Sequence, residues 1–178
     1  MAFAINISAS GGTGARIRDY WAKFGRLEPL PSMAALDYPP HVTLAIYDTI
    51  AAGKLRETSR VAFGGCPPVR LRFDKLAYFE HPQLVFWAAP EPSGSLLRVH
   101  AAVHGLIDPS LCREHYRPGQ WVPHCTLATN VSPNYRQEAL ALASKGIEPF
   151  DVVFDRADCV EFTPVRIIEG YTLLEASP

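Results

Sequence analysis

Two hexapeptides of this chain are nearly identical: PHVTLA at residues 40–45 and PHCTLA at residues 123–128. They agree at five of six positions and lie 83 residues apart. Each alternates polar with apolar side chains, which is typical of a strand with one buried face. Chance rarely places the same His and Thr twice inside such a run. The pair therefore indicates an internal duplication of the chain.

The segments around the two hexapeptides repeat in the same order. Each motif follows a strand and a helix, and precedes a helix and a long strand. The first strand and helix are expected at 3–7 and 15–24, and again at 84–88 and 95–106. The second helix and strand are expected at 50–63 and 71–75, and again at 134–145 and 152–156. Turns are expected at His81-Pro82 and Thr163-Pro164.

This order predicts an α+β fold with a duplicated, bilobal architecture. Residues 1–178 are expected to form a single domain of two pseudo-symmetric lobes. Each lobe has an antiparallel sheet of three or four strands with helices on one face, and the two sheets flank a central cleft. The hairpin at 70–89 ends one repeat and opens the next, so the lobes are expected to exchange strands.

Composition excludes several classes of protein. Seventeen Lys and Arg against 18 Asp and Glu give a net charge of −1, which disfavours a protein that coats duplex DNA. No apolar run approaches the roughly 20 residues of a membrane span, and the first residues do not resemble a signal peptide. No two of the four cysteines have metal-binding or redox spacing, so free thiols are expected. These features predict a cytoplasmic protein, expected to be a monomer, with no membrane and no duplex DNA as partner.

The His-x-Thr pattern predicts the chemistry. Side chains alternate along a strand, so His41, Thr43 and Tyr47 are expected on one face, and His124 and Thr126 on one face of the second copy. Facing lobes would then combine two imidazoles and two hydroxyls. Imidazole titrates near pH 6.5, so one ring serves as general base and the other as general acid. The threonine hydroxyls can donate hydrogen bonds to phosphoryl oxygens. This chemistry suits the opening of a cyclic phosphodiester without a metal or other cofactor.

The two motifs resemble the paired H-x-[ST]-x-hydrophobic motifs of the two-histidine (2H) phosphoesterase superfamily, in particular its 2′-5′ RNA ligase and cyclic phosphodiesterase branch. The resemblance covers nearly the whole chain in element order and is specific at residue level only in the motifs. It implies metal-independent action on 2′,3′-cyclic phosphate or 2′-5′ phosphodiester ends of RNA or nucleotides, with 2′-5′ ligation as the reverse reaction. It further implies that His41 and His124 are the acid–base pair and that Thr43 and Thr126 hold the phosphate.

Four further residues are candidates for substrate binding. Arg70 and Arg72 share a strand face and can pair with nucleotide phosphates, or form a solvated face. Tyr47 can stack on a base or touch phosphate, or pack at the edge of the core. Trp121 precedes the second motif and can stack on a base, or pack in an ordinary loop.

Two other functions remain open at this stage. One is a non-catalytic module that binds a nucleotide phosphate in the duplicated cleft. The other is a metal-dependent hydrolase that uses His100, His104 and His115. The first two lie four residues apart on an expected helix, but the segment HAAVH lacks the glutamate of a zinc-protease helix. The alternative for these two histidines is a solvated helix flank near the surface.

Overall fold

The strands form two four-stranded antiparallel sheets in a computed structural model that describes residues 1–80 and 83–174. The first sheet has the order β2-β1-β7-β8, and the second the order β5-β4-β3-β6. The first sheet contains β2 (His41–Tyr47), β1 (Ala2–Ser8), β7 (Arg156–Phe162) and β8 (Arg166–Thr172). The second contains β5 (Cys125–Ala128), β4 (Val85–Pro90), β3 (Val69–Phe79) and β6 (Phe150–Phe154). The predicted α+β fold with two antiparallel sheets is confirmed.

Strand exchange between the repeats is also confirmed. The β3–β4 hairpin joins the end of the first repeat to the start of the second, and both strands lie in the second sheet. The turn at Thr163-Pro164 separates β7 from β8 as expected. The predicted turn at His81-Pro82 lies outside the described residues.

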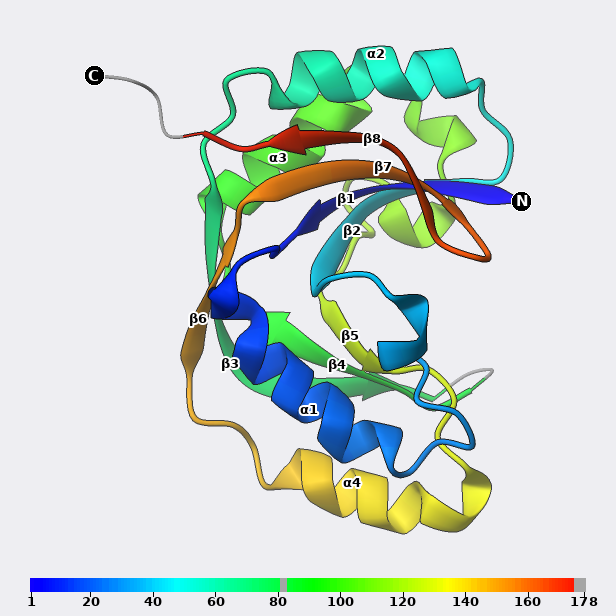
Figure 1. The fold of residues 1–178 in the computed structure, drawn as a ribbon, viewed down its shortest axis with the longest axis vertical. Coiled ribbons are helices and arrows are strands. Elements are labelled where there is room, and N and C mark those ends of the chain that lie inside the picture. The colour runs from blue at the N-terminus through cyan, green and yellow to red at the C-terminus, as the bar shows by residue number, and fades with distance from the viewer. Residues whose placement is uncertain (81–82, 175–178) are drawn as a thin grey trace.

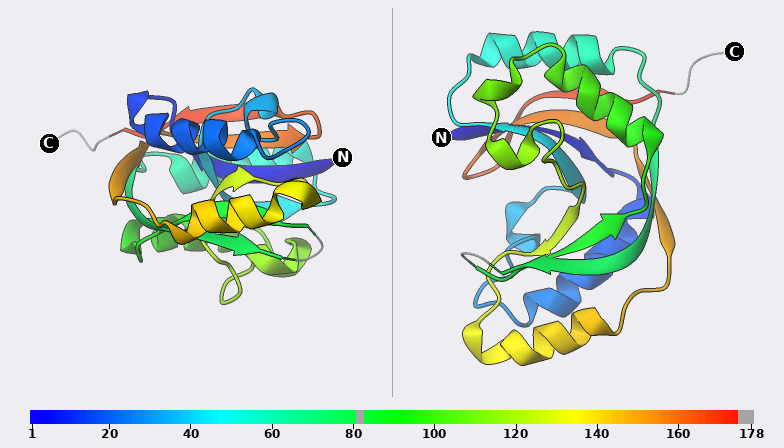
Figure 2. Two further views of the ribbon diagram at one scale, coloured as in Figure 1. Left: turned by 90° about the horizontal axis from the view of Figure 1, so that it is seen from below. Right: turned by 180° about the vertical axis from the view of Figure 1, so that it is seen from behind.

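Helices are exchanged as well, which the sequence did not indicate. The α-helices of the described residues are α1 (Ala15–Gly25), α2 (Ala52–Phe63), α3 (Gly94–His104) and α4 (Arg136–Ser144). Helix α1 follows β1 along the chain but packs against β5 of the other sheet, while α3 follows β4 and packs against β2. Figures 1 and 2 show α2 and α3 outside the first sheet and α1 and α4 outside the second.

An aromatic stripe explains where α1 packs. Its buried side chains recur at spacings of three and four residues, which makes one apolar face. Phe24, at the end of this stripe, stacks on Phe86 of β4 with ring centroids 4.7 Å apart. Both rings are fully buried. Phe24 belongs to the first repeat, but its ring thus packs in the core of the lobe that consists mostly of the second repeat.

The chain crosses between the sheets at Asp155. Residues 152–156 were expected to form one strand, but β6 ends at Phe154 and β7 begins at Arg156. The Asp155 carboxylate accepts hydrogen bonds from the backbone N–H and the hydroxyl of Ser10, at 2.7 and 2.6 Å. This contact joins the crossing point to the segment that follows β1, so the two sheets are tied where the chain passes between them.

Two further expectations concern the state of the cysteines and the presence of membrane-spanning helices. All four cysteines are free; Cys66 is half-buried and Cys112, Cys125 and Cys159 are buried. No helix in residues 1–80 and 83–174 is long and apolar enough to span a bilayer.

Candidate active site

The two motifs meet where the sheets face each other. His41 is the first residue of β2, and His124 immediately precedes β5. These strands lie beside one another although they belong to different sheets. The backbone of His41 lies within hydrogen-bonding reach of the Cys125 sulfur, and the charge of His124 affects the pKa of His41. The structure therefore brings the two predicted histidines into one site.

A β-bulge lies inside each motif. On β2, Ile5 pairs with Ala45 and Asn6 pairs with Thr43, so Leu44 is the extra residue. The same irregularity recurs on β5 within its Thr-Leu-Ala segment. A bulge inserts one residue into the alternation, so the residues beyond it change faces.

The bulge corrects the prediction for Tyr47. Its side chain was expected on the face of His41, but it is fully buried in the core on the opposite face. Ile46 takes the place beside His41 and Thr43 instead. Tyr47 therefore cannot reach a ligand that contacts the histidines.

Both imidazoles are held in the same tautomer. The Nδ1–H of His41 donates to the Pro39 carbonyl at 2.9 Å, and the Nδ1–H of His124 donates to the Val122 carbonyl at 2.7 Å. A carbonyl oxygen can only accept, so Nδ1 carries the proton in both rings. Each Nε2 is therefore left to exchange protons with a ligand. The matching contacts, each to the residue two positions earlier, are a further trace of the duplication.

The environment of both histidines favours the neutral ring. Burial lowers the pKa of His41 and of His124 below the ordinary 6.5, and the hydrogen bonds to Pro39 and Val122 oppose this effect. The charge of His124 lowers the pKa of His41 further, whereas the carboxylate of Asp158 raises it. Both pKa values thus fall on the acidic side of a free imidazole.

The depressed pKa values predict an acidic pH optimum. Acid–base catalysis by a histidine pair needs one ring neutral and the other protonated. Since both pKa values lie below 6.5, this state is most populated below pH 6.5 and is lost as the pH rises. We expect kcat/KM to peak below pH 6.5 and to decline by about tenfold per pH unit on the alkaline side. A pH profile on a substrate that does not titrate in this range measures it, and a maximum above pH 7.5 would contradict the prediction.

A buried polar network lies beside His41. The Tyr38 ring meets His41 edge to face at a centroid distance of 4.9 Å. The Tyr38 hydroxyl and the Ser8 hydroxyl both donate to Asp158 Oδ2, at 2.8 and 2.5 Å. Asp158 is 1% exposed and also lies 3.5 Å from an Arg156 nitrogen. The network fixes Tyr38 and places negative charge near His41.

His124 has an aromatic environment instead. Phe79 of β3 meets its ring edge to face at 5.7 Å, and Trp87 of β4 lies at 5.6 Å. Phe79 and Trp87 stack on each other at 5.1 Å. Phe79 is 38% exposed, so its ring is accessible next to the histidine. The two histidines are related by the repeat, but their surroundings are not.

The threonines occupy the predicted face. Thr43 lines a cavity together with His41, and Thr126 is cross-strand neighbour to Trp87, which packs near His124. Both threonines are half-buried.

Of the two roles expected for Trp121, the structure shows packing against neighbouring residues. Its ring stacks on His100 with centroids 4.0 Å apart and an interplanar angle of 3°. Its indole N–H donates to the Thr43 carbonyl at 3.0 Å, and Trp21 of α1 likewise donates to the Thr126 carbonyl at 2.9 Å. Each indole thus anchors the backbone of one motif, which is a positioning role.

Arg70 and Arg72 lie far from the histidines. Both are exposed at the start of β3, whereas Phe79 near its end contacts His124. Arg72 is seven residues from Phe79, which is about 20 Å along a strand. Its guanidinium also approaches Glu91 and Asp151, at 3.4 and 3.8 Å. The structure therefore gives no support to these arginines as ligands of the reacting phosphate.

The expectation of a solvated flank for His100 and His104 is wrong. These side chains are 5% and 6% exposed, with ring centroids 4.3 Å apart. The Nε2–H of His100 donates to the Tyr116 carbonyl at 2.9 Å, and that of His104 to the Leu44 carbonyl at 3.3 Å. Burial lowers the pKa of His100 to about 4. Among the described residues, no group of three or more His, Cys, Asp or Glu is arranged to hold a metal, so this cluster, with the exposed His115, gives a metal site no support.

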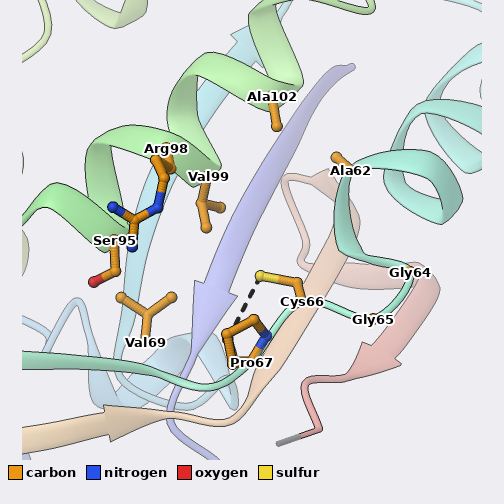
Figure 3. Close-up of a pocket in the computed structure, with 10 residues that line it drawn as sticks. All are labelled: Ala62, Gly64, Gly65, Cys66, Pro67, Val69, Ser95, Arg98, Val99 and Ala102. Atoms are coloured by element: carbon orange, nitrogen blue, oxygen red, sulfur yellow. Dashed lines mark hydrogen bonds between the residues drawn. The ribbon is translucent and has the colours of Figure 1, made fainter. Parts of the chain in front are cut away.

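A second cavity, larger than the one that His41 and Thr43 line, lies between α2 and α3. It has a volume of about 260 Å³ and is formed by the end of α2, the following loop, the first residue of β3 and one side of α3. Figure 3 shows Arg98 and the Cys66 thiol among its lining residues, with the sulfur directed to the Pro67 carbonyl. None of the ten lining residues belongs to either motif.

Comparison with known proteins identifies the family. The profile of the 2′-5′ RNA ligase superfamily matches residues 15–166, which include both motifs. The chain belongs to this superfamily. A comparison with curated proteins gives no match.

Solved structures share the fold of this superfamily member. Escherichia coli LigT in complex with 3′-AMP aligns with a TM-score of 0.64 at 17% identity, covering 96% of this chain and 97% of LigT. TT0787 of Thermus thermophilus aligns with a TM-score of 0.62 at 19% identity, covering 97% of this chain and 98% of TT0787. A structure described as a phosphoesterase aligns with a TM-score of 0.64 at 19% identity, covering 97% of both chains. At these identities the likeness establishes the fold.

Proposed function

We propose that this superfamily member is a metal-independent phosphodiesterase that acts on 2′,3′-cyclic phosphate or 2′-5′ phosphodiester ends of nucleotides or RNA. One observation carries the proposal: two imidazoles, from duplicated motifs, meet in one site with Nδ1 fixed as donor and Nε2 free. Such a pair can take one proton and give another in the same displacement at phosphorus. The LigT structures with 3′-AMP, ATP and NADP+ support nucleotides as the ligand class.

In the proposed reaction, one neutral Nε2 accepts a proton from water as the water oxygen bonds to phosphorus. The protonated Nε2 of the other histidine donates its proton to the ribose oxygen as the phosphorus–oxygen bond breaks. The product is a 2′- or a 3′-phosphate, and the two rings have exchanged protonation states. Thr43 and Thr126 donate hydrogen bonds to the non-bridging oxygens, where negative charge increases in the transition state.

Ligation is the reverse of cleavage of a 2′-5′ linkage and uses the same residues. A ribose 5′-hydroxyl of a second RNA end then replaces water as the attacking group, and a 2′-5′ linkage forms. Water at bulk concentration favours hydrolysis unless two ends are held together. The net charge of −1 argues against an extended RNA footprint, so we propose small nucleotides or short RNA ends as substrates.

The proposal is tested by incubating the protein with the four nucleoside 2′,3′-cyclic phosphates in excess EDTA. We expect opening of at least one of them to a single monophosphate isomer, at a rate that the chelator does not change. Activity lost with EDTA and restored by a divalent metal would instead favour the metal-dependent hydrolase. A nucleotide bound and recovered unchanged would favour the binding module.

A further inference from the structure

A cavity of about 140 Å³ opens beside His41 and Thr43. Its walls are otherwise largely apolar and come from β1, β2, β7 and the loops before β2 and after β7. The apolar side chains that form them include Leu36, Ile46, Val160 and Phe162. A molecule whose phosphate contacts the histidines can therefore place an attached ring among apolar side chains.

The second lobe has a bulkier residue at the equivalent strand position. Asn6 of β1 pairs with Thr43 of the first motif and lines the cavity, whereas Trp87 of β4 pairs with Thr126 of the second motif. Trp87 is 9% exposed and packs between Phe79 and His124. A large indole thus holds in the second lobe the strand position that the smaller Asn6 side chain holds in the first. This difference favours the side of His41 for a buried ring.

One polar atom of the cavity lacks a partner. The single proton of the Tyr38 hydroxyl goes to Asp158, so this oxygen can only accept from the Asn6 Nδ2 group, 3.5 Å away. This fixes the orientation of the Asn6 amide and leaves Oδ1 as an acceptor. Asn6 is 2% exposed, lines the cavity, and its Oδ1 is buried with no hydrogen bond among the described residues. Buried acceptors are rarely left unpaired, so the cavity suits a ligand with a hydrogen-bond donor.

We propose that this cavity holds a pyrimidine base, with Asn6 Oδ1 accepting a hydrogen bond from the cytosine amino group or the uracil ring N–H. The position of the attached phosphate between the histidines rests on the proposed function. A cavity of about 150 Å³ accommodates a benzene molecule, so the volume beside His41 suits one six-membered ring. The second ring of a purine extends out of it. The protein therefore prefers cytidine and uridine phosphates over adenosine and guanosine phosphates.

Equilibrium binding tests this preference without relying on turnover. Calorimetry would measure Kd for the 2′- and 3′-monophosphates of the four nucleosides and for inorganic phosphate, all in EDTA. We expect the cytidine and uridine nucleotides to bind at least about tenfold more tightly than the purine nucleotides. Asn6→Leu keeps the volume and removes the acceptor, and we expect it to weaken pyrimidine binding by roughly tenfold. Equal affinity for all four nucleosides, or tighter purine binding, would overturn the proposal.

Two substitutions fill the cavity. Val165→Trp adds bulk from the loop after β7, and Ala4→Trp adds bulk from the wall that β1 forms. Each is expected to lower pyrimidine affinity to the purine level and to leave the affinity for inorganic phosphate unchanged. The control Val61→Trp, at an exposed position of α2, leaves the preference intact. If Val165→Trp keeps the full preference, the base binds elsewhere. Selective binding of pyrimidine nucleotides without turnover of any cyclic phosphate would contradict the proposed function but would still support the base pocket.

Discussion

Replacing either His41 or His124 with alanine is expected to lower kcat on a nucleoside 2′,3′-cyclic phosphate by about 10²–10⁴-fold. Each variant lacks one of the two proton-transfer groups, while the threonines and the cavity beside His41 remain. The loss therefore appears mainly in kcat, and KM changes little. Steady-state kinetics of both variants and of the wild type measure it.

His115→Ala is the matched control, because His115 is an exposed histidine outside both motifs. We expect it to keep wild-type kcat. Circular dichroism of all three variants should match the wild type, since the imidazoles of His41 and His124 lie at the ends of strands and only partly in the core. A His41 or His124 variant that retains more than a tenth of the wild-type rate would contradict the assignment.

The largest effect on stability is expected from Phe86→Ala. The ring is fully buried and stacks on Phe24 of α1 at 4.7 Å. Removing a buried Phe side chain costs about 3–5 kcal/mol in the free energy of unfolding. Urea denaturation followed by circular dichroism gives this value, and Leu97→Ala at an exposed position of α3 should change it by less than about 0.5 kcal/mol.

A double-mutant cycle of Phe24→Ala and Phe86→Ala tests the exchanged packing of α1 itself. Contacting residues show a coupling energy of about 0.5–3 kcal/mol, whereas distant residues show additive effects. Strict additivity of the two substitutions would mean that α1 does not lie on β4.

The duplication made most of the fold predictable. Offsets of 81 to 83 residues aligned the strands and motifs of the two halves, and the two His-x-Thr motifs marked where the halves meet. Histidine and threonine on the polar face of a strand are local features, so the repeated motif, together with the family resemblance, pointed to His41, Thr43, His124 and Thr126. Helix exchange was not predictable in this way, because an amphipathic pattern shows which face of α1 is buried and not which sheet covers it.

Features that depend on tertiary structure escaped the sequence. The bulge at Leu44 moved Tyr47 into the core, and a bulge leaves no clear signal in a strand pattern. Asp158 and Asn6 lie within apolar runs, and only strand pairing brings them together beside His41. His100 is a polar residue on an amphipathic helix, but it is buried because its ring stacks on Trp121 and bonds to the Tyr116 carbonyl. One signal was available: the alignment of residues 3–7 with 84–88 places Asn6 on Trp87, and these residues differ greatly in size.

The two histidines are proposed to act as one acid–base pair on a cyclic phosphate. A decisive experiment compares kcat of His41→Ala, His124→Ala and the double variant, in excess EDTA, on the nucleoside 2′,3′-cyclic phosphate that the wild type opens fastest. Residues that act as a unit are strongly non-additive, so we expect the double variant to be about as slow as the slower single variant. Losses that multiply across the two sites, or wild-type protein that opens no cyclic phosphate, would show that the histidines do not work as such a pair.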